Sequence, residues 1–386
     1  MSEAELDKKY KKAAEIMIKA GTLPFVVSET FIKILKIYLD EEDVDFIYQN
    51  FKLKKSLSHD ELKKKSKLSD DEIDRIINKL AKKGFIFNQP SSKGIMVYRL
   101  MPIVVIGSFE YTYMKKLPED QNELQKLKEL AQLYHQLMLE LRDNVQKGYE
   151  NLLPIFEKLP EIDRTVSALK KENGEPINIV IDKTIEAEEQ VLPAQSVEEI
   201  IKKFDDIAVG NCFCRNYQKL LGHNCELNAP MEVCFTFGKS ARYTIQQGFM
   251  RRVSKDEALQ ILQKAEEAGL IHKAFHNASD IHQDENSICN CCKDCCDIFN
   301  LWRLGATGLW NSTNYISMFD QEKCIGCGEC VKRCPIDIIE LNENNKAQRV
   351  QEYCIGCGLC ARFCPEDAIY LKQGLRRVYV PPPKVL

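Results

Sequence analysis

Eight cysteines near the C-terminus occur in two copies of one spacing, with two, two and three residues between successive cysteines and a proline after the fourth. This spacing is one in which thiolates bind [4Fe–4S] clusters, so the chemistry that it predicts is one-electron transfer. A chain can enclose such a cluster only if its backbone turns tightly, and glycines lie between the ligands in both copies. The first copy contains Cys324, Cys327, Cys330 and Cys334, and the second contains Cys354, Cys357, Cys360 and Cys364.

The two copies form an internal repeat, because Ile-Gly-Cys-Gly follows the first cysteine of each and an apolar pair follows shortly after each proline. Each half is predicted to contain a ligand loop, a short helix and a short strand. In bacterial two-cluster ferredoxins the fourth cysteine of a run binds the other cluster. A zinc ribbon is the competing interpretation, but zinc sites group their cysteines in pairs. We therefore assign one cluster to Cys324, Cys327, Cys330 and Cys364, and the other to Cys354, Cys357, Cys360 and Cys334.

Nine further cysteines lie in the middle of the chain, in a pattern that is harder to interpret. A packed core does not require five thiols within eight residues, and a reducing compartment does not favour disulfides, so metal is the simplest explanation. Nine thiols exceed by one the eight that two cubanes need. The surplus thiol is free, is a redox switch, or belongs to a cluster with unusual ligation. We expect one or two further iron–sulfur clusters, or zinc, at Cys212, Cys214, Cys225, Cys234, Cys289, Cys291, Cys292, Cys295 and Cys296.

Basic and histidine side chains near these cysteines have two interpretations each. Arg251 and Arg252 could pair with the negative charge of a thiolate-bound cluster, or could form an ordinary exposed basic face. The histidines of this region could be metal ligands, but no pair has the H-E-x-x-H form. Such histidines more often lie at the surface or hydrogen-bond to a residue that binds metal. These histidines are His223, His272, His276 and His282.

Length and composition indicate a multidomain globular protein. The chain has 386 residues, of which 44% are hydrophobic and 29% charged, so two or three domains are expected. Its formal net charge of −3 argues against binding nucleic acid over the whole chain. All 17 cysteines lie between Cys212 and Cys364, which suggests metal binding in a reducing, low-oxygen cytoplasm. The N-terminus has no secretory signal, and no apolar run approaches a membrane span.

Residues 28–101 are predicted to form three helices followed by two strands. Ser58 with Glu61 is positioned to form a capping box at the second helix, and Ser69 is positioned to cap the third. This order resembles the winged-helix fold, although no signature motif supports the resemblance. The third helix, from Asp70 to Lys83, would read DNA, but its acidic start opposes phosphate binding. We therefore favour a packing or partner-docking role over DNA binding.

The segments between the cysteine groups are predicted from apolar periodicity. We expect a strand over 103–113, a long amphipathic helix over 121–149, and a connector over 150–195 with one strand at 177–181. A strand over 206–210 leads into the first middle cysteines, and Ser254 begins a helix that ends at Gly269.

The predicted fold class is a multidomain α+β protein. Its parts are a winged-helix-like domain, a helical connector, a cysteine-rich α/β middle domain, a bacterial-type two-cluster ferredoxin domain built as a βαβ repeat, and a tail. These parts are predicted to span residues 1–116, 117–195, 196–315, 316–374 and 375–386, respectively.

The combined motifs resemble the 4Fe-4S dicluster-domain proteins of anaerobic bacteria and archaea over about residues 190–375. The resemblance is carried by 207–215, 231–237 and 288–292 together with the two C-terminal runs. It implies cytoplasmic iron–sulfur electron transfer. The chain departs from this pattern at Lys293 and Asp294, where smaller residues are expected between the cysteines.

Three functions follow from these observations. The first is an electron carrier or oxidoreductase subunit that passes low-potential electrons to or from a redox partner enzyme. Since neither a Rossmann fingerprint nor a P-loop is present, that partner must supply any nucleotide cofactor. The second is a redox-sensing winged-helix transcription regulator. The third is a reductase whose chemistry occurs at a middle cluster, although no catalytic motif identifies a reaction or a catalytic residue.

Overall fold

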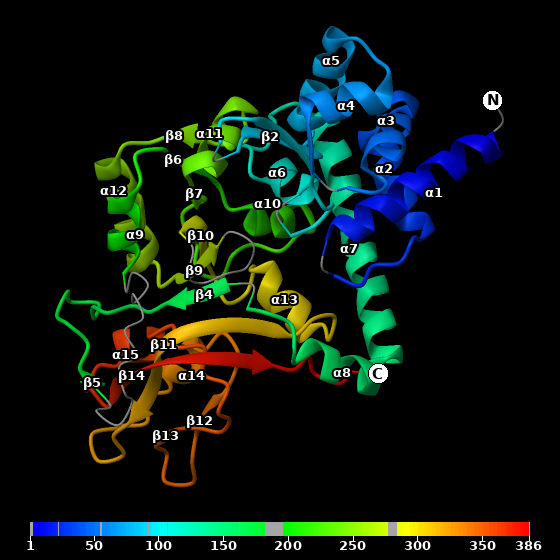
Figure 1. Cartoon of the computed structure of the whole chain (residues 1–386). Helices are drawn as coiled ribbons and strands as arrows, with labels where there is room; N and C mark the ends of the chain where they lie inside the picture. Colours follow the sequence, from blue (N-terminus) through cyan, green and yellow to red (C-terminus); the bar gives the residue numbers. More distant parts are fainter. Residues whose placement is uncertain are drawn as a thin grey trace.

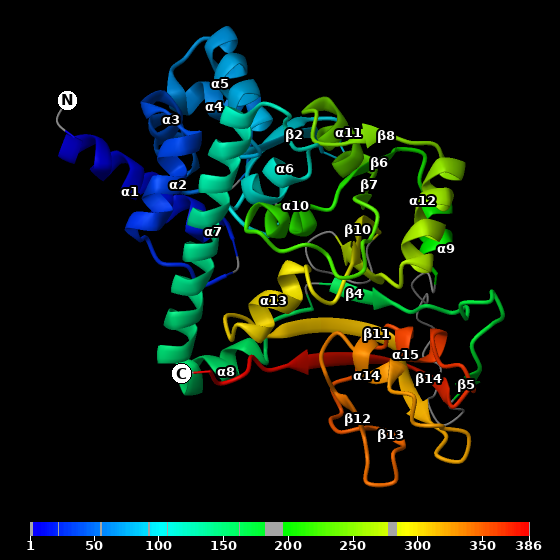
Figure 2. The same cartoon turned by 180° about the vertical axis from the view of Figure 1, so that it is seen from behind.

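In the computed structural model, the described residues are 3–21, 23–54, 56–91, 93–105, 107–161, 163–181, 196–276 and 284–385. The strands β12 (Ile339–Leu341) and β13 (Ala347–Arg349) and the helices α3–α5 lie at opposite ends of the molecule (Figures 1 and 2). The long helix α7 runs along one side. Within the described ranges, no helix is long and apolar enough to cross a membrane.

The N-terminal part consists of short helices and a small antiparallel sheet in the strand order β1-β3-β2. Its elements are α1 (Glu3–Ala20), α2 (Glu29–Tyr38), α3 (Glu41–Phe51), β1 (Ser56–Ser58), α4 (His59–Ser66), α5 (Asp70–Lys82), β2 (Ile86–Pro90) and β3 (Met96–Leu100). Ser58 and Ser69 each form a complete capping box, with Glu61 and Glu72. The three helices and two strands predicted over 28–101 are thus present as α2, α4, α5, β2 and β3, but α3 and β1 were not predicted. The winged-helix assignment stays a prediction.

The strand predicted over 103–113 is wrong, because its second half is the helix α6 (Ser108–Tyr113). The Glu110 carboxylate accepts hydrogen bonds from the amides of Val105 (2.7 Å) and Gly107 (2.8 Å), which satisfies the start of the helix. Phe109 and Tyr113 are fully buried. Aromatic residues at 109, 111 and 113 alternate with polar residues at 108, 110 and 112, which is the period of a strand. The segment is nevertheless a helix, because it is buried on nearly every side, Ser108 and Glu110 included.

The long helix ends slightly before its predicted end at residue 149, and the connector contains more secondary structure than expected. The long helix is α7 (Gln121–Lys147), and after Gly148 the chain continues as α8 (Tyr149–Phe156). The connector supplies β4 (Asp163–Val166), which was not predicted, and β5 (Ile179–Ile181), which was. Residues 182–195 of this connector lie outside the described residues.

One nine-stranded mixed sheet, in the order β5-β14-β11-β4-β9-β10-β7-β6-β8, joins the middle region to the C-terminal region. Its β11 crosses residue 316 and its β14 crosses residue 375, where sequence analysis places domain boundaries. The remaining elements are α9 (Val197–Lys203), β6 (Ile207–Asn211), α10 (Phe213–Leu220), β7 (Glu232–Phe237), α11 (Gly238–Gln246), β8 (Arg251–Arg252), α12 (Lys255–Glu267), β9 (Ile271–His276), β10 (Glu285–Cys291), α13 (Asp297–Arg303), β11 (Leu309–Phe319), α14 (Glu329–Arg333), β12 (Ile339–Leu341), β13 (Ala347–Arg349), α15 (Leu359–Arg362) and β14 (Ile369–Val380).

Candidate metal centres

The first four-cysteine site is a cavity beside α14 whose lining includes three cysteines of the first run and the last cysteine of the second, namely Cys324, Cys327, Cys330 and Cys364. Cys327 is exposed, whereas Cys324 and Cys330 are buried. The amide of Ala347 donates a hydrogen bond to Cys324 Sγ at 3.2 Å. This site therefore reaches the surface on one side.

The second four-cysteine site is a cavity with the reciprocal composition, lined by Cys334, Cys354, Cys357 and Cys360. Burial raises the pKa of Cys357 to about 12 and raises that of Cys360 well above its usual range. Without metal these thiols would stay protonated. Four thiols that converge on a cavity are the donor set of a [4Fe–4S] cluster, so the residues of both sites fit that group.

Two glycines allow the ligand loops to pass close to neighbouring backbone. Gly326 and Gly356 have φ angles of 73° and 67°. A Cβ atom at Gly326 would collide with Asn345, and one at Gly356 would collide with Thr313 and Tyr315. In these two positions the requirement for glycine is both conformational and steric.

Six of the nine middle cysteines form a ring in which each thiol is within hydrogen-bonding reach of two others. Hydrogen bonds from two neighbours lower the pKa of Cys289 to about 6, and they lower those of Cys212 and Cys296. Burial and the same hydrogen bonds raise the pKa values of the alternate thiols Cys214, Cys234 and Cys291. The ring therefore favours thiolates, the form in which cysteine binds metal, at alternate positions. Its order is Cys212, Cys214, Cys296, Cys291, Cys289 and Cys234.

The other three middle cysteines form a separate group. Cys225, Cys292 and Cys295 lie together with Asp294, and their ligand atoms are all within 4.8 Å of one another. Asp294 accepts hydrogen bonds from the Glu226 amide (2.9 Å) and from Cys295 Sγ (3.1 Å). The nine thiols thus divide into six and three, whereas the sequence suggested eight and one.

Arg215 lies between these two groups and is 3% exposed. Its guanidinium donates hydrogen bonds to the carbonyls of Pro230 and, at 2.8 Å, Asn290. Burial opposes its charge, but the nearby thiolates of Cys212 and Cys292 raise its pKa above the usual value. Sequence analysis missed this residue, although it directly follows Cys214.

A buried ion pair lies between the thiol ring and the second four-cysteine site. Lys273 Nζ is 2.6 Å from Asp163 Oδ1, and the two side chains are 2% and 4% exposed. The charge of Lys273 acts to lower the pKa of Cys357 in the second site. The charges of Cys296 and Cys289 in the ring act to raise the pKa of Asp163. Burial raises the pKa of Asp163 to about 6, although Lys273 acts in the opposite direction.

The other candidate residues have ordinary partners. Arg251 pairs with Glu232 and Glu257, and Arg252 pairs with Asp206, which agrees with the second interpretation, an exposed basic face. His223 lies 3.1 Å from Asp294. His272 Nδ1 lies 2.6 Å from Asn290 Oδ1, and His276 is buried on β9. His282 lies outside the described residues.

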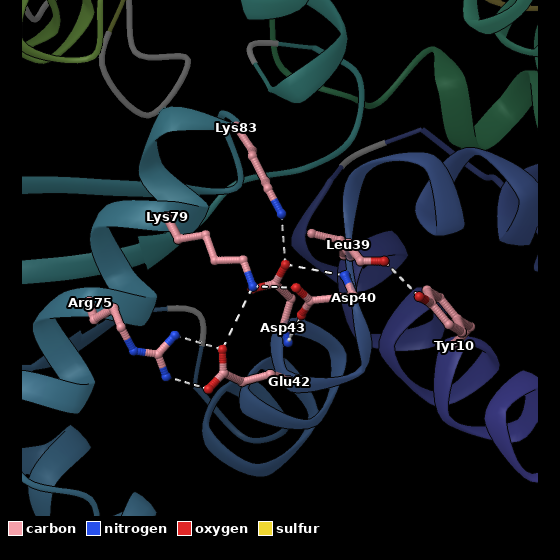
Figure 3. Close-up of polar contacts among 8 residues, drawn as sticks. All are labelled: Tyr10, Leu39, Asp40, Glu42, Asp43, Arg75, Lys79 and Lys83. Atoms are coloured by element: carbon pink, nitrogen blue, oxygen red, sulfur yellow. Dashed lines mark hydrogen bonds and ion pairs between the residues drawn. The ribbon is translucent and has the colours of Figure 1, made fainter. Parts of the chain in front are cut away.

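Two basic residues of α5, Arg75 and Lys79, and Lys83 directly after it contact acidic residues of α3 (Figure 3). Lys79 and Lys83 lie 3.0 and 2.8 Å from the buried carboxylate of Asp43. Arg75 forms a two-point contact with Glu42. These three cations are therefore neutralised within the N-terminal part itself.

Comparison with known proteins identifies only the C-terminal part. Residues 317–371 match the family described as 4Fe-4S dicluster domain. A segment of 33 residues is 54% identical to Ferredoxin-2 of Desulfomicrobium norvegicum, which corresponds to 8% of this chain and 54% of that protein. The chain thus spans about half the length of this curated relative. No solved structure matches the chain. A ferredoxin-type 4Fe-4S dicluster domain is therefore present near the C-terminus.

Proposed function

We propose that this chain is an iron–sulfur electron-transfer protein that exchanges low-potential electrons with a protein redox partner. The observation that carries the proposal is the pair of cavities lined by four cysteines each, within a segment that matches a 4Fe-4S dicluster domain. Clusters held there would supply reversible one-electron chemistry. The ligand sets that we propose are Cys324, Cys327, Cys330 and Cys364, and Cys334, Cys354, Cys357 and Cys360.

The two sites would have different roles because their exposure differs. In the first site Cys327 is exposed, and its neighbour Ile325 is 59% exposed. An apolar side chain beside an exposed ligand favours contact with a partner protein. In the second site the equivalent Cys357 is only partly exposed, and Cys334, Cys354 and Cys360 are buried. We therefore place electron exchange with the partner at the first site and internal transfer at the second.

The thiol ring would extend this route into the middle region. Cys291 and Cys296 share one buried core with cysteines of both C-terminal sites, including Cys330 and Cys360. The Lys273 ammonium lies between the ring and the second site, where a positive charge stabilises electrons added to either side. Six thiols also exceed the four ligands of a single cubane, so we propose that the ring holds one or more further iron–sulfur clusters.

For the N-terminal part we propose a winged-helix-like module that docks onto the rest of the chain and does not bind DNA. Arg75, Lys79 and Lys83 are paired with α3 carboxylates, which leaves fewer charges for phosphates. Strand β2, which would be in the wing, packs on α11, where Gln89 contacts Gln246 at 2.9 Å and Asn88 contacts Gln247 at 3.2 Å.

The test is the iron, acid-labile sulfide and zinc content of full-length protein purified without oxygen, followed by dithionite reduction monitored by electron paramagnetic resonance. We expect more than about eight irons per chain, and [4Fe–4S]⁺ signals that disappear on reoxidation. Protein that contains the clusters but cannot be reduced and reoxidised would contradict the proposal. A gel shift in low salt tests the docking role, and DNA binding by either redox state would overturn it.

A further inference from the structure

The group formed by Cys225, Cys292, Cys295 and Asp294 differs from the other cysteine sites in its dimensions. Its ligand atoms all lie within 4.8 Å of one another, and among the described residues it is the one group of three or more potential ligands that is so compact. A cubane places four irons and four sulfides between its thiolates, so its ligands must stand well apart. A tetrahedral zinc ion with Zn–S bonds of about 2.3 Å holds its ligands close together.

We infer that these four residues bind a single zinc ion, separate from the iron–sulfur centres. Three thiolates and one carboxylate complete a tetrahedral set, and a closed four-ligand site is typical of structural zinc. This inference does not depend on the proposed electron transfer, because the residues belong neither to the two C-terminal cavities nor to the thiol ring.

Asp294 provides independent support for a bound cation. Its side chain is only 8% exposed. Its Oδ2 atom is occupied by the Glu226 amide, Cys295 and His223, whereas Oδ1 is buried and receives no hydrogen bond from the described residues. A buried carboxylate oxygen without a donor is costly, and a metal ion beside it would remove that cost.

The Asp294 carboxylate is held from the side of Oδ2. The Glu226 amide donates to this oxygen at 2.9 Å, and His223 Nε2 lies 3.1 Å from it. Hydrogen bonds of this kind orient a carboxylate toward a metal ion that it binds.

The charge of the site is partly balanced by the protein. Three thiolates and a carboxylate around Zn²⁺ leave two excess negative charges. Arg215 lies within hydrogen-bonding reach of Cys292, where its guanidinium offsets one of them.

The ion would fasten the loop after α10, which carries Cys225, to the turn between β10 and α13. That turn also supports the C-terminal region, because Lys293 pairs with Asp337 at 2.6 Å. In addition, Arg303 bridges the carbonyl oxygens of Lys293 (2.8 Å) and Pro335 (2.6 Å). The zinc ion would thus fix the turn on which the thiol ring and the second four-cysteine site both depend.

The experiment measures zinc and iron per chain in full-length protein purified without oxygen, with wild type, Cys225→Ser and Asp294→Asn compared. We expect about one zinc in wild type and its loss in Cys225→Ser with iron unchanged. Asp294→Asn preserves shape and removes the charge, so we expect zinc retention against a chelator to fall by about tenfold or more. Wild type grown on Co²⁺ should show thiolate-to-cobalt charge transfer.

The matched control is Glu226→Gln, whose side chain is exposed and whose backbone amide alone contacts Asp294, and it should retain zinc. Loss of about four irons in place of zinc from Cys225→Ser would overturn the inference in favour of a cluster. A Cys292–Cys295 disulfide in zinc-free wild type would overturn it in favour of a redox pair. Unchanged zinc retention in Asp294→Asn would remove Asp294 from the ligand set. Dithionite reduction of each variant reports separately on the electron-transfer proposal.

Discussion

The two cysteine regions of this protein are built in opposite ways. In the C-terminal region, each four-cysteine site takes three ligands from one short run and one from its repeat. In the middle region, the ring collects thiols from the end of β6, from α10, β7 and β10, and from the start of α13. The first arrangement is local and repeated, whereas the second exists only after the sheet has formed.

This difference predicts that substitutions in the two regions will have different effects. A local ligand loop can bind its cluster as soon as its own backbone turns are correct. A ring assembled from distant strands depends on the packing of the sheet and on the buried charges within it. Substitutions in the two regions should therefore separate effects on single centres from effects on the whole fold.

The largest effects are expected from removing a ligand in each region, with Cys360→Ser compared with Cys296→Ser. We expect Cys360→Ser to lose about four irons from the second site and to keep the middle centre. Cys296→Ser should lose metal from the ring and keep the two [4Fe–4S]⁺ signals of the C-terminal domain. Iron analysis with electron paramagnetic resonance measures both. If Cys296→Ser also lost the C-terminal signals, the two regions would not be separable.

The next effect concerns the ion pair between the regions. Lys273→Met would remove the cation that faces the buried Asp163 carboxyl, and breaking a buried ion pair in this way costs about 3–5 kcal/mol of the free energy of unfolding. Replacing both residues, as in Lys273→Met with Asp163→Leu, should recover most of this loss. Chemical unfolding of cluster-loaded protein measures the stability. Equal stability of the single and double variants would show that the pair is not an energetic link between the regions.

Sequence analysis succeeded where the signal is local. The capped helices at Ser58 and Ser69 and the ligand loops of the C-terminal repeat each depend on residues within a few positions of one another. It missed β4, whose Asp163 and Arg164 are polar but buried, because their partners Lys273 and Glu285 lie more than a hundred residues away. No periodicity within β4 reports those partners.

The same limit applied to the middle centre. The nine cysteines were predicted to bind metal, but their division into six and three depends on strand pairing. Within Cys-Lys-Asp-Cys, Asp294 looked like a departure from the expected pattern, and it lies among the three separate thiols. The signal was present in the sequence, but only the folded chain shows which thiols Asp294 faces.

A moderate effect is expected from the glycines of the ligand loops. Gly356→Ala and Gly328→Ala both introduce a side chain at positive φ, which costs about 1–2 kcal/mol. Only at Gly356 does the new Cβ also meet neighbouring atoms, whereas the space around Gly328 is open. We therefore expect Gly356→Ala to lower the iron content of the second site, and Gly328→Ala to keep the iron of the first. Equal iron content in the two variants would mean that the close approach at Gly356 is not required.

The smallest effect is expected from Arg251. Its substitution tests whether a basic residue near the middle cysteines affects the middle centre through its position or through its charge alone. Arg251 is 46% exposed and pairs with Glu232 and Glu257, so Arg251→Gln should cost less than about 1 kcal/mol and leave metal content unchanged. Arg215→Gln is the matched contrast, because that guanidinium is buried between the two thiol groups. It should alter the reduction potential or metal content of the middle centre. A potential shift of the same size in Arg251→Gln would indicate a long-range effect of net charge. The middle centre would then be tuned by its whole surface and not by the one arginine in contact with its thiols.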